Sequence, residues 1–101
     1  MALDFHISGT EGLAGEKYVP MYLSEHELLR LRAIEKSFRI FQKMSDYWSD
    51  YSISYEELQD FKTECTTLKG INETIDQCLT DLINLSQKAY EKGLSLSVLA
   101  D

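Results

Sequence analysis

The stretch Leu94–Ala100, LSLSVLA, decides the fold, because its two-residue hydrophobic period follows directly on a long helical pattern. Successive side chains of a β-strand point to opposite faces of a sheet, so this alternation predicts a half-buried strand. The stretch Leu3–Ile7, LDFHI, has the same period, with Asp4 and His6 on its polar side. The sequence therefore predicts a strand near each end of the chain.

Between these two strands apolar residues recur at spacings of three and four, which is typical of helices. Unpaired strand edges leave backbone groups without partners, so we expect the two terminal strands to lie side by side in one sheet. The predicted fold class is α+β, with a two- or three-stranded sheet covered by three or four helices. Tyr51–Ile53 is a candidate third strand, and Tyr18–Leu23 a short extended segment that Pro20 limits to a sheet edge or to the end of a strand. A length of 101 residues fits a single domain, 1–101.

The first helical region is predicted to begin at Ser24, which can form a capping box with Glu27. A helix of 25 residues would be about 37 Å long, too long for a compact domain of this size. We therefore expect a bend or break near Ser37. The predicted inward face of this region consists of Leu31, Ile34, Phe38, Phe41 and Trp48.

Two later helices have clearer boundaries. Ser54 and Glu57 form a second capping box, and Gly70 ends the helix that begins there. Asn72 caps the last helix, which stops at Lys92-Gly93. The predicted inward residues are Leu58, Phe61, Cys65 and Leu68 in the first of these helices, and Ile75, Cys78, Leu79, Leu82, Leu85 and Ala89 in the second.

The composition limits the partners and the compartment. Seventeen acidic and ten basic residues give a formal charge of −7, which repels nucleic acid and anionic lipid and favours a basic protein partner. No apolar run approaches the roughly 20 residues that span a bilayer. The N-terminal residues lack the basic and apolar regions of a signal peptide, so we expect a cytoplasmic protein.

Residues for catalysis are scarce. The glycines of the loop Ser8–Glu16, which we expect to be flexible, match neither a P-loop nor a dinucleotide-binding pattern. His6 and His26 are predicted to be surface imidazoles, and Cys65 and Cys78 buried, unreactive free thiols. We therefore predict a protein that is not an enzyme, with no catalytic, cofactor-binding or metal-binding residues. A small enzyme or a metal binder remains an alternative.

The stretch Ser45–Tyr55, SDYWSDYSISY, combines aromatic and acidic side chains. If helical periodicity continues, Trp48 joins the core, while Tyr47 and Tyr51, at i and i+4, share an outer face with Asp50. Tyrosines dominate interface hot spots, and carboxylates steer cationic partners. The predicted partner-binding residues are Asp46, Tyr47, Asp50 and Tyr51; a helix-to-helix corner lined by tyrosines is the alternative interpretation.

A second electrostatic feature is a basic strip. On a continuous helix the spacings of four, three and four would place its residues on one face, where they either form a solvated surface or bind an acidic partner. The acidic half of a second copy would suit such a strip, which gives the alternative function of a structural homo-oligomer or assembly subunit. The strip consists of Arg32, Lys36, Arg39 and Lys43.

In size, acidity and tyrosines beside aspartates, the chain resembles the intracellular immunity proteins and antitoxins that block basic toxin nucleases. The paired adjacent tyrosines of helical nuclease-immunity proteins are absent, since Trp48 follows Tyr47. The resemblance assigns no residue roles. The function it favours is that of a bacterial, non-enzymatic, immunity- or antitoxin-type inhibitor that occludes a basic protein site.

Overall fold

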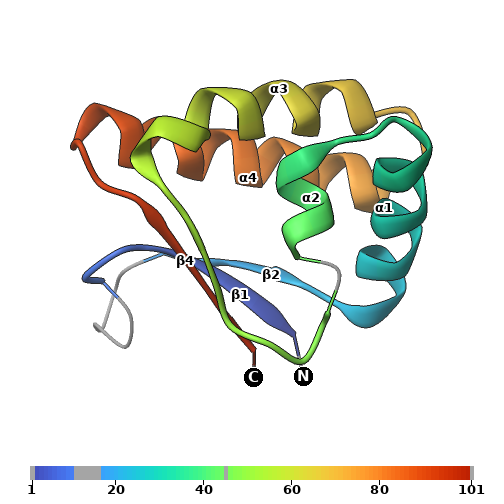
Figure 1. Cartoon of the computed structure of the whole chain (residues 1–101), viewed down its shortest axis with the longest axis horizontal. Coiled ribbons are helices and arrows are strands. Elements are labelled where there is room, and N and C mark those ends of the chain that lie inside the picture. Colours follow the sequence, from blue (N-terminus) through green and yellow to red (C-terminus); the bar gives the residue numbers. More distant parts are fainter. Residues whose placement is uncertain (1, 11–16, 45, 101) are drawn as a thin grey trace.

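The structure, a computed structural model, describes residues 2–10, 17–44 and 46–100. Helices cover one face of an antiparallel sheet in this part of the chain, in two layers (Figure 1). The strands are β1 (Leu3–Ile7), β2 (Val19–Met21), β3 (Tyr51–Ile53) and β4 (Leu96–Ala100). The helices are α1 (Leu23–Glu35), α2 (Arg39–Lys43), α3 (Leu58–Leu68) and α4 (Glu73–Glu91), with a short 3-10 turn η1 (Tyr55–Glu57) before α3.

The sheet confirms the α+β class and the pairing of the terminal strands. Its order is β2-β1-β4-β3, and β1 pairs with β4 from Leu3 opposite Ala100 to Ile7 opposite Leu96. The sheet has four strands instead of two or three, because both short extended segments join it at its edges. Pro20 lies in the edge strand β2, where a missing backbone N–H costs no ladder bond on the outer side. Gly12, Gly15 and Glu16 of the predicted glycine-rich loop lie outside the described residues.

The core forms between the inner face of the sheet and the helices. Along β1 the residues at the odd positions are buried and those at the even positions are partly exposed, as the alternation predicted. Phe61 of α3 lies near the middle of the core, with its ring centroid 6.2 Å from that of Phe5 and 5.3 Å from that of Phe41. Aromatic contacts of this kind join β1 of the sheet to α2 and α3 of the helical layer across the core.

The beginning of α1 differs from the prediction. The helix begins at Leu23, so Ser24 lies inside its first turn, and the Ser24–Glu27 capping box is wrong. The Tyr22 backbone N–H instead donates to Glu25 Oε1 at 3.0 Å. Glu25 is buried and reaches back to the chain leaving β2, whereas Glu27 points to solvent. The short connection from β2 thus sets the start of the helix.

The inward face of α1 also differs. His26, Leu29 and Ala33 are buried, and these positions have the same three-and-four spacing as the predicted set. Leu31 and Ile34, predicted to be core, are each 52% exposed. Apolar residues occur around most of this helix, so periodicity alone could not select the buried face.

The predicted break at Ser37 is confirmed. Ser37 has φ 57°, a left-handed conformation that ends α1, and α2 begins two residues later in a new direction. The longest dimension of the molecule is 34 Å, shorter than the helix that would have continued through this point. Phe41 of α2 is buried as predicted, and Phe38 packs against the core.

Glu64 holds the start of α2 in its new direction. Its side chain is only 8% exposed, and its two carboxylate oxygens accept the backbone N–H groups of Ile40 at 3.2 Å and Phe41 at 3.1 Å. These are amides that a helix cannot satisfy within its own first turn. A carboxylate on α3 therefore caps a five-residue helix that would be too short to persist alone.

The boundaries of α3 and α4 match the prediction closely. Ser54 and Glu57 form their capping box, with the Ser54 N–H donating to Glu57 Oε1 at 3.1 Å. Asn72 caps α4 by accepting the Ile75 N–H at 2.9 Å. Gly93 has φ 68° and lies just beyond the end of α4, where the Leu94 N–H donates to Ala89 O at 2.9 Å. All ten core positions predicted in these two helices are buried.

Replacing Glu64 by glutamine should destabilise the protein by about 1–3 kcal/mol, because an amide NH₂ would face a buried backbone N–H that has lost its acceptor. Urea unfolding followed by circular dichroism measures the change. Glu35→Gln, an exposed glutamate at the end of α1, is the matched control and should change stability by less than about 0.5 kcal/mol. Equal effects of the two substitutions would contradict this role of Glu64.

Candidate interaction surface

The connection between α2 and β3 forms a compact turn over residues 46–50. Asp46 Oδ1 accepts the Trp48 backbone N–H at 2.9 Å, and its Oδ2 accepts the Ser49 hydroxyl at 2.6 Å. An aspartate that binds the N–H two residues ahead forms an Asx turn, which replaces helix geometry with a tight reversal. The hydrogen bond from Ser49, and then that from Trp48, lower the pKa of Asp46, so this exposed side chain carries its negative charge.

This turn reverses the predicted positions of two aromatic residues. Tyr47, predicted on the outer face, is 5% exposed, and its ring lies edge-on to His26 with centroids 5.2 Å apart. Trp48, predicted in the core, is 58% exposed and lies edge-on to Tyr47 at 5.0 Å. The prediction is wrong because α2 ends at Lys43, so a helical period no longer applies at Trp48.

The ends of the turn are fixed to the sheet. The Tyr51 hydroxyl donates to Asp46 O at 2.9 Å and accepts the Asp46 N–H at 3.0 Å. Asp50 Oδ1 accepts the Ala100 N–H at 2.7 Å and so binds the turn to the end of β4. Tyr51 is half-buried, and both aspartates are exposed. Of the four predicted partner-binding residues, the structure therefore leaves the two carboxylates on the surface and uses the two tyrosines to support the turn.

Trp48 is the residue that sequence reasoning missed. The signal that could have found it is Asp46 two residues before it, because an Asx turn at that point ends helical periodicity. Trp48 is the single tryptophan of the chain. Its ring stands outside the core, and two exposed aspartates flank it in sequence, on a turn that hydrogen bonds hold in place at both ends. We call Asp46, Trp48 and Asp50 the tryptophan turn.

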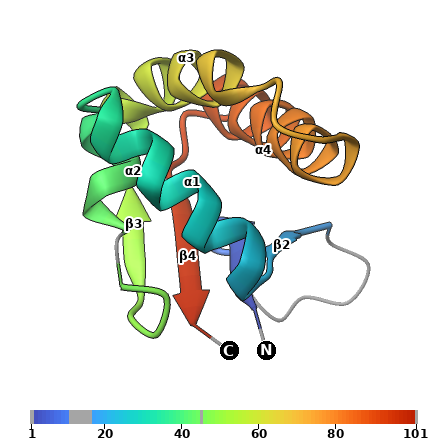
Figure 2. The ribbon, with the colours of Figure 1, turned by 90° about the vertical axis from the view of Figure 1, so that its right-hand side faces the viewer.

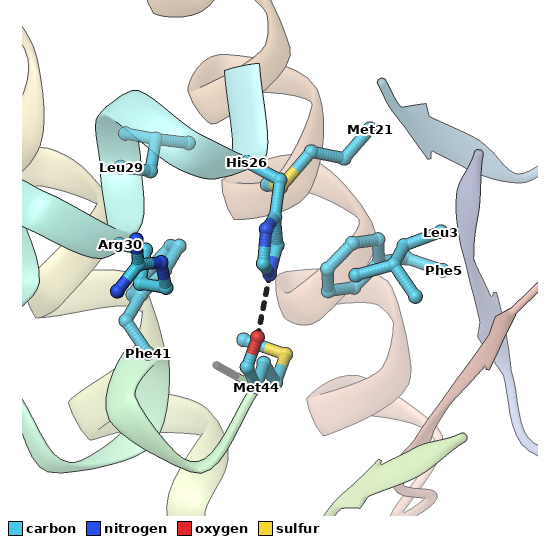
Figure 3. A pocket seen from close by; sticks show the side chains of 8 residues that line it. All are labelled: Leu3, Phe5, Met21, His26, Leu29, Arg30, Phe41 and Met44. Atoms are coloured by element: carbon cyan, nitrogen blue, oxygen red, sulfur yellow. Dashed lines mark hydrogen bonds between the residues drawn. The ribbon is translucent and has the colours of Figure 1, made fainter. Parts of the chain in front are cut away.

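His26 lies behind this turn in a buried position, so its prediction as a surface imidazole is wrong. Its Nε2–H donates to Met44 O at 2.6 Å, across a small gap between α1 and α2 (Figure 3). The cavity there has a volume of about 10 Å³ and is lined mostly by core side chains such as Leu29 and Phe41. That volume holds at most one water molecule, so the site has a structural role and no room for a substrate.

The other histidine is equally unsuited to a metal site. His6 is half-buried on the open face of the sheet, and its ring stacks on Tyr18 with centroids 5.1 Å apart. Within residues 2–10, 17–44 and 46–100, no three His, Cys, Asp or Glu side chains gather closely enough to hold a metal ion.

The predicted basic strip does not form one face, because the break at Ser37 separates its two halves. Lys43 Nζ lies 2.8 Å from Glu57 Oε1, and the Arg39 guanidinium lies 3.6 Å from Glu57 and 3.8 Å from Asp60. The half on α2 therefore pairs with acids of η1 and α3 within the same chain. These ion pairs link α2 to η1 and α3.

Glu57 should make stability pH-dependent. The hydrogen bond from Lys43 lowers the pKa of Glu57 below its ordinary 4.5, with further lowering from Ser54. Because the pKa is lower in the folded state, the stabilisation is complete above pH 4.5 and is lost as pH falls through the folded value. The free-energy difference between wild type and Glu57→Gln, measured by urea unfolding over a pH series, should therefore shrink below pH 4.5.

Asp60→Asn is the control for this series, because the Asp60 side chain is 70% exposed and its ion pair is longer. Its effect should be smaller at every pH. If the difference in unfolding free energy between Glu57→Gln and wild type stays constant over the pH series, the pKa of Glu57 is not lowered in the folded protein.

The two cysteines are buried free thiols, as predicted. Burial, and then the neighbouring Cys78, raise the pKa of Cys65 well above its usual value, and burial raises the pKa of Cys78 to about 12. Since the thiolate is the reactive form, burial and the raised pKa values both disfavour nucleophilic attack by these thiols in the folded protein.

A thiol reagent such as a dithiobisbenzoate should therefore label neither cysteine in the native protein and both in urea. Counting labels by mass spectrometry, with Cys78→Ala to isolate Cys65, checks this expectation. One thiol reacting rapidly without denaturant would show that a cysteine is accessible and ionised.

In comparisons with known proteins, no family model, no curated protein and no solved structure matches this chain. None of the helices in the described part of the chain is both long enough and apolar enough to cross a bilayer.

Proposed function

We propose that this protein acts by binding a basic protein partner through the tryptophan turn, as an inhibitor of the immunity or antitoxin type. The observation that carries the proposal is the position of Trp48, which is 58% exposed on a turn fixed to both the core and β4. An exposed indole has a solvation cost in the free protein that a partner's pocket would relieve. Tryptophan is also the residue type most enriched among interface hot spots.

The turn is suited to binding because it is already ordered. Asp46 is held by Trp48 and Ser49, and Tyr51 fixes the Asp46 backbone. Tyr47 supports one side of the indole ring. A partner would therefore bind a preformed surface and would avoid much of the entropy that ordering a flexible loop costs.

Charge supports a basic partner. Asp46 and Asp50 flank Trp48, and the formal charge of the whole chain is −7. An acidic surface of this kind accelerates association with a basic protein and orients the encounter. The most concrete version of the function is occlusion of a cationic active site, with the indole as anchor and the two carboxylates pairing with basic side chains at its rim.

Affinity purification from the source cell, with the full chain as bait, tests the proposal. Wild type should retain a basic protein that Trp48→Ala loses, because truncating a hot-spot tryptophan costs at least about 2 kcal/mol, or roughly thirtyfold in affinity. Tyr18→Ala, which removes another exposed aromatic ring, is the matched control and should retain the partner. The proposal fails if no retained protein depends on Trp48.

Association kinetics test the electrostatic part separately. Asp50→Asn removes a charge but keeps an acceptor for the Ala100 N–H, so it should slow association with the purified partner and flatten its salt dependence. Trp48 fluorescence in a stopped-flow instrument follows the reaction. Unchanged association rates in Asp46→Asn and Asp50→Asn would show that these carboxylates do not steer the partner.

A further inference from the structure

Two tyrosines outside the tryptophan turn form a parallel pair of rings. Tyr55 begins η1, and Tyr90 lies in the last turn of α4. Their ring centroids are 5.0 Å apart, and their planes are inclined by only 2°. This geometry is that of an offset-stacked pair, in which the face of one ring overlaps part of the other.

The fold holds both rings in place. Tyr90 packs against the core, and Nζ of Lys62, on α3, lies 5.8 Å from the centroid of its ring. Tyr55 directly follows Ser54, which forms the capping box of η1 with Glu57. Figure 2 shows α3 and α4 side by side in the helical layer, and the ring pair joins the end of α4 to the turn before α3.

The hydroxyl groups of the pair also lie close together. The Tyr90 hydroxyl, within hydrogen-bonding reach, raises the pKa of Tyr55, so Tyr55 is an uncharged phenol at neutral pH. In a tyrosine ring the two Cε carbons flank the carbon that bears the hydroxyl group. Parallel rings that bring their hydroxyls together therefore also bring a Cε carbon of one ring close to a Cε carbon of the other. Coupling of two phenols through carbon requires this arrangement.

The pair is accessible from solution. Tyr55 is 38% exposed and Tyr90 is partly exposed, so a one-electron oxidant can reach the rings. The rings of Tyr18 and Tyr47, by contrast, contact histidine rings, which do not supply a second phenol. The Tyr55–Tyr90 pair thus combines exposure with two phenols in contact.

We propose that Tyr55 and Tyr90 form an oxidative modification site, at which a haem peroxidase with hydrogen peroxide joins the two rings into an intramolecular dityrosine. The new bond would close the pair α3–α4 at the end opposite to its connection at Gly70. A cross-link there restricts the unfolded chain and so stabilises the fold. Neither tyrosine belongs to the tryptophan turn, so this inference is independent of the proposed function.

The chemistry of the step balances. Each phenol loses one electron to the oxidised haem and its hydroxyl proton to solvent, which leaves two phenoxyl radicals. Their unpaired electrons, located partly on the Cε carbons, combine in a Cε–Cε bond. Each of these carbons then loses its hydrogen as a proton and each oxygen regains one, which restores both aromatic phenols. Hydrogen peroxide takes up the two electrons and two protons and becomes two water molecules.

Treatment of the dilute full chain with a haem peroxidase and hydrogen peroxide, followed by intact-mass and peptide mass spectrometry, tests the proposal. Monomeric wild type should lose two hydrogen atoms and yield a cross-linked peptide pair that joins Tyr55 to Tyr90. Tyr55→Phe and Tyr90→Phe keep the stacked rings but remove one phenol, and each should abolish this product. Tyr22→Phe, which alters another exposed tyrosine, is the matched control and should leave the product unchanged.

Urea unfolding of the treated proteins measures the effect of the cross-link. Cross-linked wild type should unfold at a higher urea concentration than untreated wild type, because the bond lowers the entropy of the unfolded chain. Tyr55→Phe treated in the same way should show no such shift. The proposal is overturned if treated wild type contains no dityrosine within the monomer, or if the linked monomer persists in folded Tyr55→Phe.

Discussion

The structure depends on the break at Ser37 and on the carboxylate that secures the next helix. A helix that continued past Ser37 would have carried one apolar face from Leu31 through Phe41. The left-handed Ser37 instead ends α1, and Glu64 accepts the first free amides of α2. Because that carboxylate comes from α3, the direction of α2 is set by tertiary contact and not by its own five residues.

The exposure of apolar residues on α1 and the exposure of Trp48 both result from this break. Phe41 turns into the core against Phe61, and α1 then buries Leu29 and Ala33, which leaves Leu31 and Ile34 on the outside. After Lys43 the chain is no longer helical, so the Asx turn at Asp46 can bury Tyr47 and expose Trp48.

The sequence was sufficient to predict those features of the fold that depend on interactions between residues close together in the chain. Asn72, Gly93 and the Ser54–Glu57 pair determine helix ends through hydrogen bonds a few residues away, and the alternation of β1 and β4 identifies their buried sides. The inward face of α1 could not be predicted, because two sets of residues have the same spacing and only tertiary packing distinguishes them.

The sequence predicted which segment carries the candidate site but not which of its aromatic side chains is exposed. The carboxylates of Asp46 and Asp50 are exposed, but the aromatic residue beside them is Trp48 and not Tyr47. The error arose because the prediction applied helical spacing as far as Trp48, whereas α2 ends at Lys43. His26 was missed for a similar reason, since its burial depends on the Met44 carbonyl, eighteen residues away in sequence.

Fluorescence of the single tryptophan tests this account most directly, because emission excited at the red edge of the absorption band, where the six tyrosines absorb little, reports on Trp48. In the free protein, at low concentration, the account predicts emission near that of indole in water and efficient quenching by acrylamide. It also predicts that unfolding in urea changes both quantities only slightly. A blue-shifted emission that acrylamide quenches only after unfolding would place Trp48 in the core and contradict the break, the turn and the proposed surface together.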